Sequence, residues 1–147
     1  MGSAAVVDGL RRWARGAYAE EAAVELLVRS FGGRFASTGF EWVRACDAPG
    51  WFWLDGEPLR NGTGAMSGGE RRLLGVVGAL VSGPTVVDLA DVASGLDRPH
   101  LGLVLAALAH AGGSHEHSDF SLQDGRAVFC RLSPLVDWPT PGMELAS

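Results

Sequence analysis

The stretch from Met66 to Asp97 constrains the fold more than any other part of the chain. It opens with Met-Ser-Gly-Gly-Glu, continues through an apolar run, turns at a Gly-Pro pair, and resumes as Thr-Val-Val-Asp-Leu-Ala-Asp-Val-Ala-Ser-Gly-Leu-Asp. Apolar side chains surround nearly the whole circumference of the first run, which is typical of a helix buried on most sides. We therefore predict a helix over residues 70–82, a short strand from Val86 to Leu89, and a polar loop after the strand.

The start of the predicted helix has two interpretations. Ser67 and Glu70 stand three positions apart directly before the apolar run, which is the pattern of a capping box and needs no ligand. The two glycines between them place free N–H groups at the positive end of the helix, which favours an anion. Arg71 and Arg72 lie in the same first turn, where the helix dipole disfavours cations. An anionic ligand or a protein partner at these arginines would relieve that conflict.

The same stretch resembles the signature loop, Walker B segment and D-loop of ATP-binding-cassette ATPases, and is most similar to the SMC and recombination-protein branch. The family usually places thirty residues between the signature serine and the last D-loop aspartate, as between Ser67 and Asp97. Ala79-Leu80, Pro84 and Ser94-Gly95-Leu96-Asp97 fall in the same register. In the family this loop contacts ATP bound by another subunit. The resemblance therefore implies nucleotide contact in trans by Ser67, Gly68, Gly69, Glu70 and Asp97.

The remainder of a cassette ATP site is missing. The sequence has no lysine, so it cannot complete a phosphate loop of the G-x-x-x-x-G-K-[ST] type. In the family register Ala90 replaces the metal-holding aspartate and Asp91 replaces the catalytic glutamate, which leaves Asp91 as the catalytic candidate. Asp88 would share a strand face with Ala90, either as a substitute metal ligand or as a buried structural aspartate. The resemblance thus implies a degenerate, non-hydrolysing domain that reaches ATP only through a partner subunit, with no cofactor certain.

Composition narrows the class of partner. The formal net charge is −5 and at most two arginines are adjacent, so nucleic-acid binding is not indicated. No apolar run approaches the length of a membrane span, so we expect a cytoplasmic protein that is not associated with a membrane. We predict an accessory or interaction subunit that binds a protein partner, either a phosphate-loop ATPase subunit or a second copy of the chain. A DNA-associated accessory protein is the alternative that the SMC-like residues leave open.

A histidine-rich segment near the C-terminus supports a different function. His115, His117 and Asp119 would share one face of an extended segment. Two imidazoles and a carboxylate are ligands for a divalent transition metal, which would make the protein a small metal-dependent enzyme. The simpler interpretation is a polar surface loop.

The remaining sequence indicates one small α/β domain over residues 1–132 and an extended, proline-containing tail over residues 133–147. The domain is expected to resemble the C-terminal half of a cassette-type P-loop NTPase, with the predicted strand between two helices. Cys46 and Cys130 are expected to be free and buried, with a disulfide between them as the alternative.

Apolar periodicity predicts helix from Ala4 to Phe31, with Gly9 and Gly16 as candidate breaks that would divide it in two. A change to a period of two predicts a β-hairpin or small meander from Arg34 to Leu59. A second long helix is expected from Arg98 to Ala111, and a second hairpin from Phe120 to Leu132.

Overall fold

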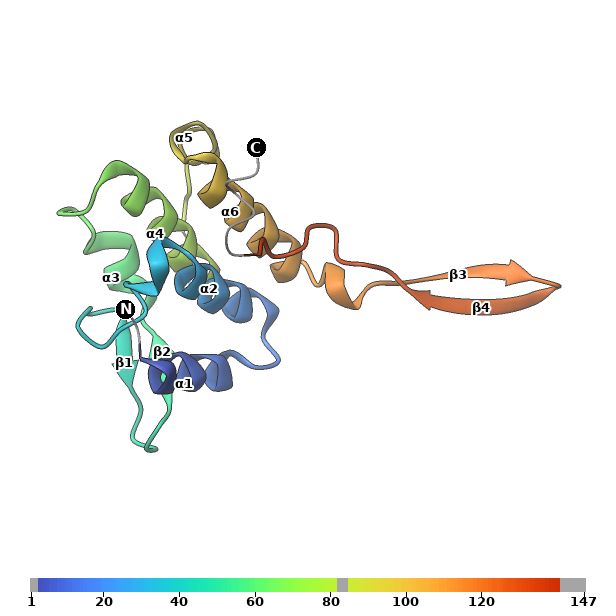
Figure 1. The fold of residues 1–147 in the computed structure, drawn as a ribbon, viewed down its shortest axis with the longest axis horizontal. Helices are drawn as coiled ribbons and strands as arrows, with labels where there is room; N and C mark the ends of the chain where they lie inside the picture. The colour runs from blue at the N-terminus through green and yellow to red at the C-terminus, as the bar shows by residue number, and fades with distance from the viewer. Residues whose placement is uncertain (1–2, 82–84, 141–147) are drawn as a thin grey trace.

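The computed structural model describes residues 3–81 and 85–140. They form a helical body from which one β-hairpin projects (Figure 1). Helices and two antiparallel hairpins together make a small mixed α/β domain, as predicted. In chain order the described elements are α1 (Ala4–Ala14), α2 (Tyr18–Arg29), η1 (Phe31–Gly33), β1 (Val43–Ala45), β2 (Phe52–Leu54), α3 (Gly56–Asn61), α4 (Gly68–Val81), α5 (Leu89–Gly95), α6 (Arg98–Ala111), η2 (Ser114–Glu116), β3 (Ser118–Gln123) and β4 (Arg126–Arg131).

The predicted N-terminal helix is divided into α1 and α2. Ser3 begins α1, because its hydroxyl accepts a hydrogen bond from the Val6 N–H at 3.2 Å. The break falls at Gly16, whose φ of 93° is a left-handed value that glycine adopts without strain. Gly9 lies inside α1 for a different reason. A Cβ at Gly9 would lie 2.5 Å from the Gly50 oxygen, so only glycine allows the β1–β2 hairpin to approach this closely.

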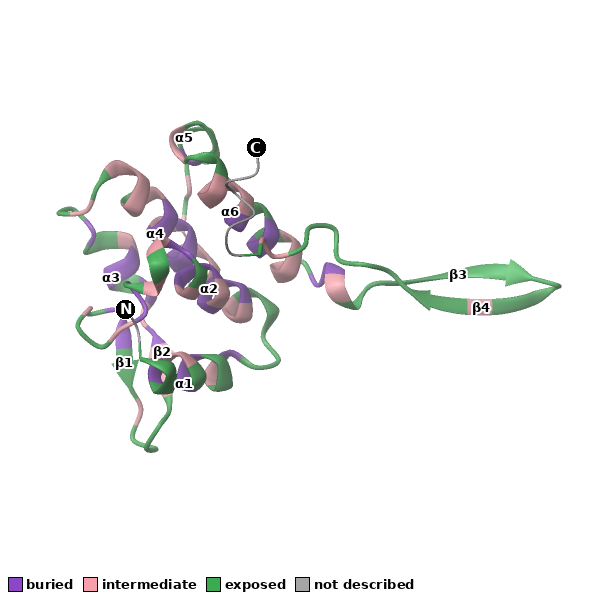
Figure 2. Cartoon of the chain, viewed as in Figure 1, coloured by how far each residue is buried: buried purple, intermediate pink, exposed green. Residues whose placement is uncertain are grey.

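The hydrophobic core is centred on α2, which contacts α1, α4 and α6. Buried residues concentrate where these helices meet, while the projecting hairpin is exposed (Figure 2). Full burial of one large apolar side chain stabilises the fold by about 1.5–3 kcal/mol. The largest fully buried side chains include Leu10, Leu26, Leu27, Phe35, Leu54, Leu59, Leu73 and Leu74.

The second predicted hairpin is confirmed as β3 and β4. Asp124 and Gly125 form the turn with φ values of 52° and 77°, which is the left-handed pair of a tight hairpin turn. Phe120 lies opposite Phe129 across the two strands. The hairpin extends away from the helical body, and its strands are exposed almost throughout (Figures 1 and 2).

The predicted strand from Val86 to Leu89 is wrong. Residues 85–88 have no regular structure, Val86 is 99% exposed, and α5 begins at Leu89. Each described strand pairs only within its own hairpin, so this segment has no neighbouring strand to pair with. The Asp88 carboxylate instead accepts the Asp91 N–H at 3.0 Å and so begins a helix. The predicted Gly83-Pro84 turn lies outside the described residues.

The first part of the tail lies against the helical body. The Arg29 guanidinium lies 4.8 Å from the centre of the Trp138 ring, and the Leu135 N–H donates to the Ser114 hydroxyl at 3.2 Å. Residues 141–147 lie outside the described part of the chain. Both cysteines are free as predicted, but the expectation that they are buried is wrong, because Cys46 is half-buried and Cys130 is exposed. No helix within the described ranges is long and apolar enough to cross a bilayer.

Candidate functional site

Helix α4 begins with the predicted capping box. The Ser67 hydroxyl accepts the Glu70 N–H at 3.3 Å, and the Glu70 carboxylate accepts the Ser67 N–H at 2.9 Å. The second oxygen of the Glu70 carboxylate forms an ion pair with Arg34. Glu70 is therefore engaged in fixing the helix start and in joining α4 to the residues that follow η1.

The other groups at the start of α4 remain accessible. Ser67 is exposed, and its hydroxyl hydrogen has no acceptor among the described residues. A Cβ at Gly69 would meet no atom within 4 Å, so the space beside this glycine is open. The N–H groups of Gly68 and Gly69 belong to the first turn, where a helix has no internal acceptors for them. A small set of hydrogen-bond donors without acceptors inside the helix thus lies at the positive end of α4.

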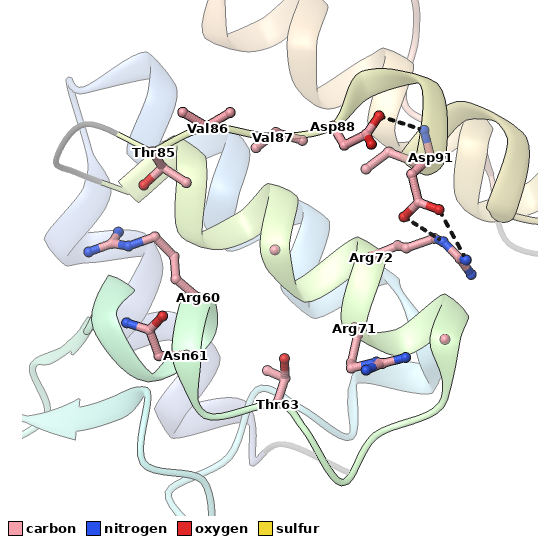
Figure 3. Close-up of a pocket in the computed structure, with 13 residues that line it drawn as sticks. Arg60, Asn61, Thr63, Arg71, Arg72, Thr85, Val86, Val87, Asp88 and Asp91 are labelled. Carbon is pink, nitrogen blue, oxygen red and sulfur yellow. Dashed lines mark hydrogen bonds and ion pairs between the residues drawn. The ribbon is translucent and has the colours of Figure 1, made fainter.

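A cavity of about 680 Å³ lies beside this helix start. Arg60 from α3 and Arg71 and Arg72 from α4 line it, opposite the segment from Thr85 to Val92 (Figure 3). Arg60 donates to the Gly78 carbonyl oxygen at 3.1 Å, which fixes the guanidinium against α4. Arg71 is exposed, and its guanidinium makes no hydrogen bond or ion pair with any described residue, although its backbone N–H donates to the Ser67 carbonyl oxygen at 2.9 Å. The cavity therefore has a cationic side that an anion could reach.

Arg72 connects α4 to α5. Its Nε and Nη2 atoms donate to the two Asp91 carboxylate oxygens at 3.0 and 3.2 Å (Figure 3). The pKa of Arg72 is raised by this hydrogen-bonded contact and by the negative charge of Asp91. A Cβ at Gly95 would lie 2.3 Å from the Arg72 Nε, so the side chain also passes close to the end of α5. Of the two predicted anion contacts, only Arg71 keeps a guanidinium without an acidic partner among the described residues.

The predicted catalytic residue lies in the first turn of a helix. Asp91 is in α5, where its carboxylate is held by Arg72 and its N–H is held by Asp88. The sequence left Asp88 as a substitute metal ligand or a buried structural aspartate. In the structure Asp88 is exposed and its side chain begins α5. These two carboxylates are thus placed by a salt bridge and a helix cap.

Asp97 begins α6. Its Oδ1 atom accepts the His100 N–H at 2.9 Å and lies 2.7 Å from the His100 Nδ1. Burial raises the pKa of Asp97, but the hydrogen bonds and charge of His100 outweigh burial, so the pKa lies below its ordinary value. The His100 ring stacks on Phe31 at 4.0 Å between ring centres. The aspartate predicted to contact a nucleotide therefore has a local structural role as a helix cap.

The predicted metal set of His115, His117 and Asp119 does not come together among the described residues. The turn η2 carries His115 inward against Tyr18, with ring centres 4.8 Å apart. His117 and Asp119 lie at the exposed base of the hairpin, where the Asp119 carboxylate accepts the Phe120 N–H at 2.8 Å. The prediction assumed an extended segment, and the 3₁₀ turn at Ser114–Glu116 breaks that geometry.

His115 instead approaches two residues that the sequence did not single out, Glu21 from α2 and His110 from α6. Glu21 and His110 are far apart in the chain, and neither belongs to a recognisable ligand spacing. Only the contact between α2 and α6 brings them together.

Comparisons with protein-family models, with curated protein sequences and with solved structures find no significant match. The residues of the site therefore carry the functional argument.

Proposed function

We propose that this protein is a non-hydrolysing accessory subunit, related to cassette ATPases, that contacts a polyphosphate held by a partner protein. The start of α4 makes the contact through the N–H groups of Gly68 and Gly69, the Ser67 hydroxyl and the Arg71 guanidinium. The observation that carries the proposal is the exposed Arg71 guanidinium and the open space at Gly69, beside a cavity with arginines on one side and Asp88 and Asp91 on the other. Phosphate oxygens accept hydrogen bonds from such donors, and the helix dipole favours the negative charge.

Two features support a non-hydrolysing role. The chain has no lysine for a phosphate loop, so a second copy of it could not supply one either. The nucleotide-holding partner is therefore a different protein. Asp91 forms a two-point ion pair with Arg72, which disfavours its use as a general base because both carboxylate oxygens are engaged and their orientation is restricted. We expect no ATP hydrolysis by the isolated protein.

The projecting hairpin supports the interaction role. Phe120, Leu122 and Phe129 are 59%, 73% and 76% exposed and lie on paired strands. An isolated two-stranded hairpin is marginally stable in water, and exposed apolar patches mark protein interfaces. A partner protein that covers these side chains would stabilise the hairpin.

Titration of the labelled protein with sodium tripolyphosphate and with ATP tests the proposal. Backbone amide NMR signals of Gly68 and Gly69 should shift, with a dissociation constant of about 1 mM, because so few contacts supply only about 4 kcal/mol. The variant Arg71→Gln should bind at least several-fold more weakly. Arg126→Gln, which removes the same charge from an exposed position on β4, is the matched control and should bind like the natural protein.

Two results would refute the proposal. One is that the Gly68 and Gly69 signals do not shift at tripolyphosphate concentrations well above the expected dissociation constant, since the α4 start would then not be the contact. The other is sustained ATP hydrolysis by the isolated protein that disappears in Asp91→Ala, since the domain would then be an enzyme.

A further inference from the structure

Three potential metal ligands converge where α2, α6 and η2 meet, at the root of the projecting hairpin. Glu21, His110 and His115 each offer one ligand atom, and these atoms lie within 4.8 Å of one another. The Nε2 atom of His110 is 2.8 Å from the Glu21 Oε1. These residues are distinct from the α4 start and take no part in the proposed polyphosphate contact.

The His115 ring shows that the cluster is more than a glutamate–histidine pair. Its Nδ1 atom is buried and has no hydrogen-bond partner among the described residues. A buried imidazole nitrogen without a partner has a substantial desolvation cost, and a bound cation would offset that cost. The ring is also held in place, because Tyr18 contacts it edge-on at 4.8 Å and His110 stacks on it at 4.0 Å.

We propose that Glu21, His110 and His115 bind a divalent transition-metal ion of the Zn²⁺ type. Two imidazoles and one carboxylate suit zinc and its neighbours, whereas Mg²⁺ and Ca²⁺ prefer ligand sets made of oxygen. Three protein ligands leave one tetrahedral position open for water or another small ligand. Cavities of about 450 Å³ and 180 Å³ adjoin His110 and leave room for this fourth ligand.

Binding requires a small rearrangement. Ligand atoms of a tetrahedral zinc site lie about 3.4 Å apart when the metal–ligand bonds are about 2.0–2.1 Å long. The present spread of 4.8 Å must therefore contract slightly. The two imidazole planes are 8° from parallel, so the His115 ring must also tilt to direct a nitrogen at the ion. Its unpartnered Nδ1 has no protein hydrogen bond to lose in this movement.

The position of the site indicates what the ion does. Glu21 is anchored by the Gly16 N–H at 3.0 Å, and Ser114 beside His115 accepts the Leu135 N–H from the tail. An ion shared by α2, α6 and η2 would fix the root of the hairpin and the start of the tail against the helical body. Zn²⁺ should therefore raise the melting temperature and slow proteolysis near residues 114–118.

Isothermal titration of tag-free protein with Zn²⁺ tests the site, because an affinity tag of histidines would bind the metal itself. We expect one Zn²⁺ per chain. His115→Ala and Glu21→Gln should each weaken binding at least about 100-fold, since loss of a direct ligand should cost no less than loss of a supporting residue. His117→Ala is the matched control, because it removes a nearby exposed histidine and should leave the affinity unchanged.

The metal-induced rise in melting temperature gives a second readout and should disappear in Glu21→Gln. If His115→Ala fails to fold, Glu21→Gln alone decides between the outcomes. Absence of Zn²⁺ binding at micromolar concentration, natural affinity in Glu21→Gln, or loss of binding in His117→Ala would each overturn the proposal.

Discussion

Replacement of Ser67 separates the structural role of the α4 start from its proposed role in binding. The hydroxyl accepts the Glu70 N–H at 3.3 Å, which is a long hydrogen bond at an exposed position. Ser67→Ala removes this bond but keeps the bond from the Ser67 N–H to the Glu70 carboxylate, which uses the backbone. Loss of a serine N-cap costs about 0.5–2 kcal/mol, and the long bond places Ser67→Ala near the lower end, about 0.5–1 kcal/mol.

Ser67→Asp changes the charge while it keeps the cap. Aspartate is as good an N-cap as serine, and the helix dipole favours its charge, whereas repulsion from the Glu70 carboxylate opposes it by a similar few tenths of a kcal/mol. We therefore expect Ser67→Asp to stay within about 0.5 kcal/mol of the natural protein. Tripolyphosphate binding should be lost in Ser67→Asp, because the new carboxylate occupies the place of the anion. Ser67→Ala should only weaken binding, since both glycine N–H groups remain.

Urea unfolding followed by tryptophan fluorescence gives the stabilities, because Trp42 is buried in the core and reports its loss. The Ser67→Ala variant should melt about 1–4 °C lower, given that 1 kcal/mol shifts a domain of this size by about 2–4 °C. The reasoning is refuted if Ser67→Asp binds tripolyphosphate as tightly as the natural protein. Unchanged stability in Ser67→Ala would show that the capping bond contributes nothing in solution.

Two further predictions concern the core and the pH dependence. Gly9→Ala should destabilise the protein by about 1–3 kcal/mol, because the new methyl group would overpack against the β1–β2 hairpin. Gly75→Ala should stabilise the protein by about 0.5–1 kcal/mol, because a Cβ at Gly75 would enter open space. Thermal melts of the two variants test both expectations. Burial raises the pKa of Glu25, but hydrogen bonds from Arg11 and Arg29 at 2.8 and 3.0 Å outweigh it and lower the pKa overall. The two ion pairs of the Glu25 carboxylate therefore stabilise the fold fully above the ordinary glutamate pKa of about 4.3. This contribution is lost as the pH drops through the lowered pKa of the folded protein. Urea unfolding in this acid range should show a weaker pH dependence for Glu25→Gln, and an equal dependence would contradict the assignment.

Local signals in the sequence predicted most of the regular structure. The N-terminal helices, α4 and α6 follow apolar periodicity, and pairs of glycines lie just beyond the ends of α2 and α6. Asp124 and Gly125 alone specified the second hairpin, because both must adopt positive φ. The capping box at Ser67 and Glu70 was also predictable, since its two partners are three residues apart.

The features that the sequence did not predict depend on contacts between distant segments. The apolar residues Val86, Val87 and Leu89 favoured a strand from Val86 to Leu89, but a strand requires a neighbour, and the described strands pair only within their own hairpins. Asp88 then begins α5 instead. Similarly, the ion pair of Arg72 with Asp91 and the approach of Glu21 to His115 join separate elements. Spacing along the chain carries no signal for such pairs.

Capping explains part of the resemblance to cassette ATPases without any ligand. Ser67 and Glu70 begin α4, and Asp97 begins α6, so a protein with these two helix starts would keep all three residues. Capping does not explain Gly68 and Gly69, because glycine within a helix costs up to about 1 kcal/mol relative to alanine. A Cβ at Gly69 would meet no atom within 4 Å, so packing among the described residues does not require glycine there, whereas a Cβ at Gly68 would lie 2.9 Å from the Arg72 Nη1 atom of the guanidinium that Asp91 holds. Close approach of an external group to the backbone favours glycine, so the proposed polyphosphate contact offers a reason for Gly69 that capping does not. Gly69→Ala should therefore weaken tripolyphosphate binding if the proposal holds, and unchanged binding in this variant would count against it.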